Sequence, residues 1–203
     1  MPATTAARTI VSRRMARPAR REQLLQAAAA AFLERGFDGT SMETVADHAG
    51  VTRMLVYRHF ESKHALYRAV LTSAIEHVQL AVSPDAAGSE PGIAGQLVLA
   101  ARQTPDAFRL LWRHARHEPD FAADALAFRR IAADFADEIL RDLIPDPRRR
   151  HWSATLVVDF LYAGICNHLD EGAEADDAEF ARHLHRGVAG MITAWQDGNQ
   201  RQT

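Results

Sequence analysis

One short stretch of this chain, residues 52–59, combines side chains that recognise nucleic acids. An arginine fork donates two parallel hydrogen bonds to guanine, and apolar groups contact the methyl group of thymine. If the stretch is a recognition helix, Thr52, Arg53 and Met54 stand at its N-terminal end, nearest the base edges. The candidates for phosphate contacts, about one helical turn later, are Tyr57, Arg58 and His59.

The residues around this stretch predict the helices that would position it. Thr40 and Glu43 have the spacing of a capping box, in which each side chain caps the other residue's backbone N–H. Gly50 supplies a left-handed position that ends this helix and turns the chain. Thr52 is placed to cap the next helix, and Ser62 to cap a third. Two short helices joined by a tight turn form a helix-turn-helix, a common DNA-binding unit.

Two of the predicted helix N-termini add candidate phosphate contacts. The free N–H groups at a helix N-terminus favour anions. One such terminus begins at Thr40 or Ser41, and the other at Lys63. The alternative is that Tyr57 and His59 are half-buried packing residues and Lys63 is an ordinary surface charge. The full set of candidate DNA contacts is Thr40, Ser41, Thr52, Arg53, Met54, Tyr57, Arg58, His59 and Lys63.

The same region resembles the DNA-binding domain of the TetR family of transcriptional regulators. The resemblance covers residues 21–71 and is carried by the runs LLQAAAAAFLERGFDGTSMETVADHAGV and YRHFESKHALYRAVL. The residues that carry it are Phe32, Gly36-Phe37, Thr40, Val45-Ala46, Ala49-Gly50-Val51, Tyr57, His59-Phe60, Lys63 and Leu66. It implies a repressor that dimerises through its last two helices. The chain departs from the family pattern at Met54-Leu55, where many members carry small residues, often Gly-Thr; Met54 could instead meet a thymine methyl group.

The composition is typical of a soluble globular protein. The 203 residues, 47% of them hydrophobic, suffice for one or two small domains with a real core. The single cysteine, Cys166, leaves no partner for an intrachain disulfide. No apolar run approaches the length of a membrane span, and the N-terminus lacks a signal-peptide core. We therefore expect a cytoplasmic protein with no membrane association.

The charges are divided unevenly along the chain. Residues 1–70 contain 11 Lys and Arg against 6 Asp and Glu, whereas the remainder is acidic, and the whole chain has a net charge of −2. This is the pattern of a DNA-binding head on a regulatory body. Residues 1–21 hold six Arg and no acidic residue. They are either a solubilising tail or an arm that adds phosphate or minor-groove contacts.

Beyond the helix-turn-helix, every long segment has helical periodicity, which predicts an all-α protein. The expected division is a disordered basic arm over residues 1–20, a three-helix domain over 21–66 and a regulatory and dimerisation domain over 67–203. A loop rich in Pro, Gly and Ser spans residues 83–92. A long amphipathic helix after Pro119 has its apolar stripe at Phe121, Ala125, Phe128, Ala132, Phe135, Ile139 and Leu143.

The last two expected helices predict a homodimer. Residues 154–166 are apolar almost all round, and such a helix has to be covered on every side. The final helix has an apolar face, and its Gly187 and Gly190 permit close approach of another helix. Two such helices from each of two chains form a four-helix interface, although they could also complete a monomeric core. A two-fold dimer implies an operator that is an inverted repeat of double-stranded DNA.

Aromatic side chains in the second half of the chain are the candidates for a small-molecule site. Together they could line an apolar cavity, or they could form an ordinary aromatic core. Asp159, within an apolar helix, could bind a cationic or hydrogen-bonding ligand or pair with an arginine at the dimer interface. The candidate ligand contacts are Phe108, Leu111, Trp112, Phe128, Phe135, Asp159 and Tyr162.

Signatures of metal binding and catalysis are missing from the sequence. The closely spaced pairs His114/His117 and His183/His185 lack a carboxylate–histidine signature and adjoin arginines. No Gly-rich phosphate loop or nucleophile elbow is present. We expect no metal, no cofactor and no enzyme, although a small helical enzyme remains a third interpretation. The leading interpretation is a homodimeric repressor released from its operator by a small apolar effector, and the runner-up is a ligand-independent DNA-binding dimer or an activator.

Overall fold

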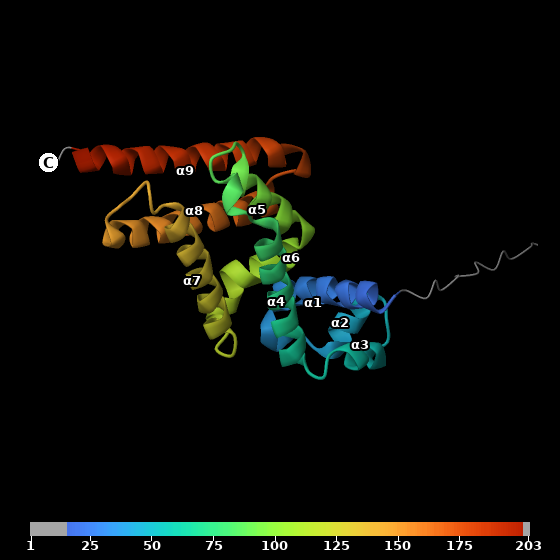
Figure 1. The fold of residues 1–203 in the computed structure, drawn as a ribbon. Coiled ribbons are helices and arrows are strands. Elements are labelled where there is room, and N and C mark those ends of the chain that lie inside the picture. The colour runs from blue at the N-terminus through green and yellow to red at the C-terminus, as the bar shows by residue number, and fades with distance from the viewer. Residues whose placement is uncertain (1–15, 201–203) are drawn as a thin grey trace, which may run out of the picture.

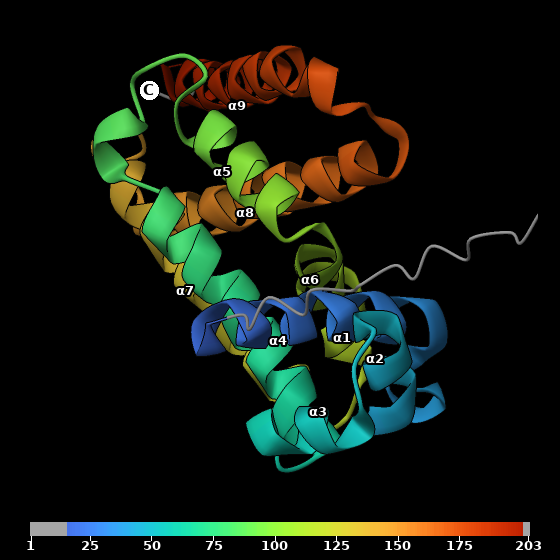
Figure 2. The same cartoon turned by 90° about the vertical axis from the view of Figure 1, so that its right-hand side faces the viewer.

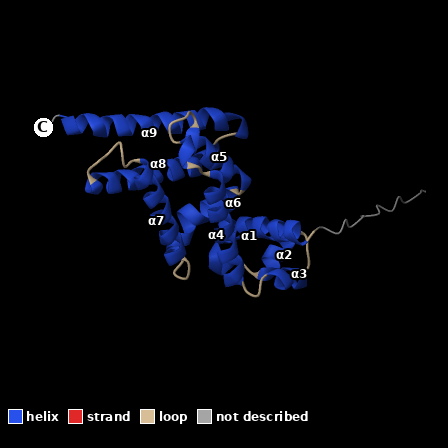
Figure 3. Ribbon diagram, in the orientation of Figure 1, coloured by secondary structure: helices blue, strands red, loops and turns tan. Residues whose placement is uncertain are grey.

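The structure, a computed structural model, describes residues 16–200, and within them it contains nine α-helices and no strand (Figure 3). The all-α prediction is confirmed. The helices are α1 (Arg17–Gly39), α2 (Met42–Ala49), α3 (Arg53–His59), α4 (Lys63–Ala81), α5 (Gly92–Gln103), α6 (Pro105–Arg109), α7 (Ala122–Ile139), α8 (Pro147–Glu171) and α9 (Asp177–Gln200). The proposed arm lies mostly outside the described residues, and α1 begins at Arg17, inside its expected range.

The helices form a head and a body (Figure 1). The head contains α1, α2 and α3 with the first half of α4, and the body contains α5 to α9. Figure 2 shows α4 running from the head into the body, with α1 crossing it. The helix is therefore continuous across the expected domain boundary at residue 66.

The head closes around apolar side chains from each of its helices. The fully buried members include Leu24, Phe32, Val45, Val56 and Leu66. A side chain of α1 also reaches the end of α2, because Gln23 Nε2 donates to the backbone carbonyl of Ala49 (2.8 Å). These contacts pack α2 and α3 together and α2 against α1.

Two glycines shape the head where the backbone enters the left-handed region. Gly36 (φ 71°) interrupts the regular geometry of α1 and returns Phe37 to the core. Gly50 (φ 63°) ends α2 and turns the chain toward α3, as predicted. The predicted cap at Ser62 is also confirmed, because its side chain accepts from the backbone N–H of Ala65 (3.1 Å).

In the body, α7 packs along α8, and α5 packs along α9. The predicted stripe of α7 holds at Phe121, Ala125 and Phe128, which are buried. It fails at the end, where Leu143 is exposed and Ile144 is buried. The reason is that α7 ends at Ile139, so the helical period does not extend to Leu143.

Phe121, just before α7, joins the body to the head. Its ring is fully buried and lies 5.1 Å from the ring of Phe37 and 4.3 Å from that of Tyr67. An ion pair of 3.2 Å between Arg68 Nε and Asp124 Oδ2 lies beside this contact. A displacement of the start of α7 would therefore change the packing against both α1 and α4.

Candidate nucleic-acid interface

Helix α3 presents most of its side chains to solvent. Val56 anchors it in the core, whereas Met54 is 75% exposed and Tyr57 43%. Thr52, at its N-cap, makes no side-chain capping bond, so its hydroxyl stays free, and Arg53 is exposed beside it. The structure thus brings the predicted base-reading residues together on one open surface at the N-terminal end of α3.

Arg53 and Tyr57 form a pair one turn apart on this surface. Arg53 Nη2 donates to Tyr57 Oη (3.3 Å), and the guanidinium carbon lies 5.3 Å from the centre of the tyrosine ring. The hydrogen bond to Tyr57 raises the pKa of Arg53. Stacking on the ring restricts the rotamers of a long side chain, which reduces the entropy lost when its fork meets a base.

A group of arginines surrounds the C-terminal end of α3. Partial burial lowers the pKa of His59, and the positive charges of Arg17, Arg58, Arg21 and Arg20 lower it further. Three of these arginines belong to α1, which places its N-terminal turn beside α3. The sequence showed the arginines of the first residues but not their position, because only the packing of α1 brings them to this surface.

Thr40 is a correction to the predicted set. Its side chain is in the core, with 2% exposed, where the hydroxyl donates to the carbonyl oxygen of Gly36 (2.7 Å) and lies 3.1 Å from that of Ala31. It is therefore not available to a phosphate. Ser41 caps α2 instead, in a capping box with Thr44 rather than the predicted Thr40–Glu43 pair.

Lys63 has an internal partner. Its Nζ donates to the carbonyl oxygen of Phe37 (2.7 Å) and lies 4.2 Å from the centre of the Phe37 ring. The side chain thus ties the start of α4 to the end of α1. Two of its three N–H donors remain for another acceptor, and a phosphate contact at Lys63 stays a prediction.

The predicted ligand contacts in the body form a packed aromatic cluster. Tyr162 is stacked with Phe108 (5.4 Å between centroids) and Trp112 (4.7 Å), and its ring meets the ring of Phe128 edge-on (5.6 Å). Leu111 is also buried, and Phe135 is half-buried. Burial raises the pKa of Tyr162. A ligand at this place would have to separate these rings, so a site here stays a prediction.

Asp159 pairs with an arginine of the same chain. Its carboxylate accepts from Arg129 Nη2, and that guanidinium lies 4.2 Å from the centre of the Trp112 ring. The observed partner of Asp159 thus belongs to its own chain, whereas the sequence suggested an arginine at the interface; ligand binding by Asp159 stays a prediction. Among residues 16–200, no group of three or more His, Cys, Asp or Glu side chains is placed to hold a metal ion.

Comparison with known proteins gives a family for the head. Residues 24–70 match the family of bacterial regulatory proteins, tetR family. Residues 24–70 are thus similar to the N-terminal DNA-binding domain of TetR-family regulators. The chain is 43% identical over 65 residues to the HTH-type transcriptional activator FasR of Mycolicibacterium smegmatis, covering 32% of this chain and 30% of that protein. It is also 44% identical over 56 residues to the HTH-type transcriptional regulator TtgR of Pseudomonas putida, covering 28% and 27%.

The chain therefore matches less than a third of the length of these two relatives. They are transcriptional regulators and not enzymes, in agreement with the expectation from the sequence. No helix in the described range 16–200 is long and apolar enough to cross a membrane.

Solved structures extend the likeness of fold to most of the chain. A TetR-like transcriptional regulator from Rhodococcus sp. RHA1 superposes with a TM-score of 0.66 at 22% identity, covering 87% of this chain and all of that one. A transcriptional regulator from Aquifex aeolicus VF5 superposes with a TM-score of 0.69 at 16% identity, covering 85% and 99%. The helical body thus has the fold seen in TetR-like proteins.

Proposed function

We propose that this chain is a cytoplasmic, homodimeric transcriptional regulator that binds an inverted-repeat operator. The observation that carries the proposal is the open face of α3, where Arg53 and Tyr57 are paired within a TetR-family domain. In a helix-turn-helix the second helix enters the major groove with its N-terminal residues at the base edges. The arginines of α1 beside α3 extend this surface with positive charge suited to phosphates.

The dimer is supported by an exposed apolar stripe on α8. Trp152, Leu156 and Phe160, spaced at four-residue intervals, are each more than a third exposed. Soluble monomers rarely leave such a stripe uncovered. Gly187 of α9 lies against Phe160, since a Cβ at that glycine would come 2.9 Å from the ring. We place the stripe and α9 in a four-helix interface between two copies of the chain.

An effector would act by changing the spacing of the two heads. The route is short, because α7 packs on α8 and Phe121 at its start packs on α1 and α4. A ligand that moves α7 changes the fit of both heads to their half-sites together. We favour repression relieved by a small apolar ligand. Both repressors and activators occur among relatives with a similar N-terminal region, since KstR2 is named as a repressor and FasR as an activator.

One observation favours the alternative of a ligand-independent DNA-binding dimer or an activator. The aromatic cluster expected to bind the effector is filled by its own rings. If those rings do not separate, the body serves dimerisation alone.

The test is selection of bound sites from random DNA by the full chain, repeated with a panel of apolar compounds. An inverted repeat in the selected sites supports the dimeric regulator, and its loss from the bound pool with one compound supports effector release. Enrichment of single half-sites would contradict the dimer, and absence of enrichment would contradict specific DNA binding. Binding that no compound changes favours the ligand-independent alternative.

A further inference from the structure

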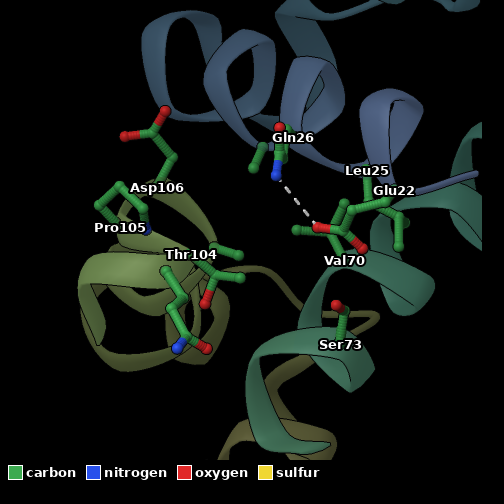
Figure 4. A pocket seen from close by; sticks show the side chains of 11 residues that line it. Glu22, Leu25, Gln26, Val70, Ser73, Thr104, Pro105 and Asp106 are labelled. Carbon is green, nitrogen blue, oxygen red and sulfur yellow. Dashed lines mark hydrogen bonds between the residues drawn. The ribbon is translucent and has the colours of Figure 1, made fainter. Parts of the chain in front are cut away.

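A cavity of about 300 Å³ lies where the head meets the body (Figure 4). Its walls come from α1, α4 and the junction of α5 and α6, and its apolar lining includes Leu25 and Val70. It is separate from the aromatic cluster, because none of the rings of that cluster lines it. The volume is at the lower end of small-molecule sites, which suits a compact ligand.

Two hydroxyls in this cavity lack partners among the described residues. Ser73 is 8% exposed and Thr104 is 7% exposed. Thr104 stands at the N-cap of α6 but makes no side-chain capping bond. The hydrogen bond recorded at Ser73 is to its backbone carbonyl, from His77 Nδ1 (2.7 Å). No described side chain bonds either hydroxyl, so both can bond a polar group of a ligand in the cavity.

The cavity also has an uncompensated negative charge. The Glu22 carboxylate accepts from Gln26 Nε2 (3.2 Å) and has no ion-pair partner within residues 16–200. Asp106, at the rim, is neutralised by Arg109, with 3.0 Å between Oδ1 and Nη1. No Lys, Arg or His is among the described lining residues. A cation placed here would gain the attraction of Glu22, while the Arg109 guanidinium at the rim is already paired with Asp106.

We propose that this cavity binds a compact organic cation. Its charged nitrogen lies between the Glu22 carboxylate and the hydroxyls of Ser73 and Thr104, and its apolar part lies on Leu25 and Val70. Figure 4 shows the Glu22 carboxylate and the Ser73 hydroxyl turned toward the same space. The three oxygens accept hydrogen bonds from an ammonium or amidinium group, which an uncharged alcohol of the same shape cannot supply in full.

Such a ligand would contact the head and the body at once. Glu22 and Ser73 belong to α1 and α4, whereas Thr104 belongs to the body. Occupancy is therefore linked to the position of the head relative to the body, and by reciprocity DNA binding changes the affinity for the cation. This regulatory part rests on the proposed function; binding of the cation does not.

The first experiment measures binding without DNA. Isotope-labelled full-length protein is titrated with 2-phenylethylammonium and, separately, with its uncharged analogue 2-phenylethanol, followed by NMR chemical shifts. We expect saturable binding of the ammonium, about fivefold or more tighter than the alcohol, because a partly buried carboxylate faces the charge. Glu22→Gln should remove this preference, and Ser73→Ala should weaken binding of the ammonium.

Two exposed residues of α4 provide matched controls. Glu76→Gln removes a carboxylate and Thr72→Ala removes a hydroxyl, both outside the cavity lining. Both should bind the ammonium like the wild type. Equal affinity for ammonium and alcohol, no saturable binding, or an unchanged preference in Glu22→Gln would overturn the site.

The second experiment measures operator binding by fluorescence anisotropy with and without saturating 2-phenylethylammonium. We expect the ammonium to change the operator dissociation constant of the wild type, and to leave that of Glu22→Gln unchanged. If the cation binds but operator affinity stays the same in the wild type, the regulatory link is wrong. If the protein selects no operator, the proposed function fails while the first experiment still decides the site.

Discussion

Arg53 carries the sharpest functional expectation at the scale of single residues. Held on Tyr57 at the exposed start of α3, it is placed to donate two hydrogen bonds to a guanine. We predict that Arg53→Ala weakens operator binding by about 1–3 kcal/mol and relaxes preference at one base position. The measurement is operator affinity across single-base variants. Arg58→Ala is the control, expected to weaken all sequences alike; the same uniform loss for Arg53→Ala would rule out direct readout.

Lys63 donates a hydrogen bond within the protein and is also predicted to contact a DNA phosphate. The loss of its bond to the Phe37 carbonyl should lower the free energy of unfolding of Lys63→Ala by about 1–3 kcal/mol. A lost phosphate contact should also reduce the salt dependence of DNA binding by about one unit in log–log slope. Urea unfolding and binding at several salt concentrations measure the two effects. Reduced stability with an unchanged slope would make Lys63 a purely structural residue.

His59 predicts a pH dependence of stability. Its pKa in the folded protein lies below the ordinary value of 6.5 because of partial burial and neighbouring arginines. As the pH falls below 6.5, the unfolded chain takes up this proton first, so stability decreases until the folded pKa is passed. We predict that His59→Gln loses less stability than the wild type between pH 7.5 and 5.5 in urea unfolding. The exposed His151→Gln is the control; equal pH sensitivity of His59→Gln and wild type would contradict the shift.

At the scale of elements, the join between α1 and α2 depends on two hydroxyls with different tasks. Thr40 binds backbone carbonyls in the core, and Ser41 caps α2 at the surface. The sequence pattern predicted the cap one residue too early, because Thr40 and Ser41 have equivalent capping chemistry and only packing shows which of them is buried.

We predict that Thr40→Val destabilises the fold by about 1–3 kcal/mol, because the buried Thr40 hydroxyl and the hydrogen bond that it donates to the carbonyl of Gly36 are lost. The salt dependence of DNA binding should not change. Thr40→Ser keeps the hydroxyl and is the matched variant, expected to lose less stability. Chemical unfolding and salt-dependent binding test both; a reduced salt slope in Thr40→Val would restore the phosphate contact.

At the scale of the whole molecule, α8 links the proposed dimer to DNA binding. A buried, unpaired carboxylate is costly in an apolar interface. We predict that Leu156→Glu shifts the protein to monomer in sedimentation velocity and weakens operator binding about tenfold or more, because one head then meets one half-site. Leu80→Glu, at an exposed leucine of α4, is the control. A dimeric Leu156→Glu variant would place the interface elsewhere.

By itself, the sequence determined the helical class of the protein, the helix-turn-helix and most of the residues that begin and end its helices. Gly50 and Ser62 act through bonds within a few residues, so their effects are readable from local chemistry. The tertiary structure decided what depends on contacts between distant segments: the burial of Thr40, the arginines of α1 beside α3, the insertion of Phe121 into the head, and the cavity at Glu22. Residue spacing does not encode these positions, because side chains far apart in the chain meet only when the helices pack.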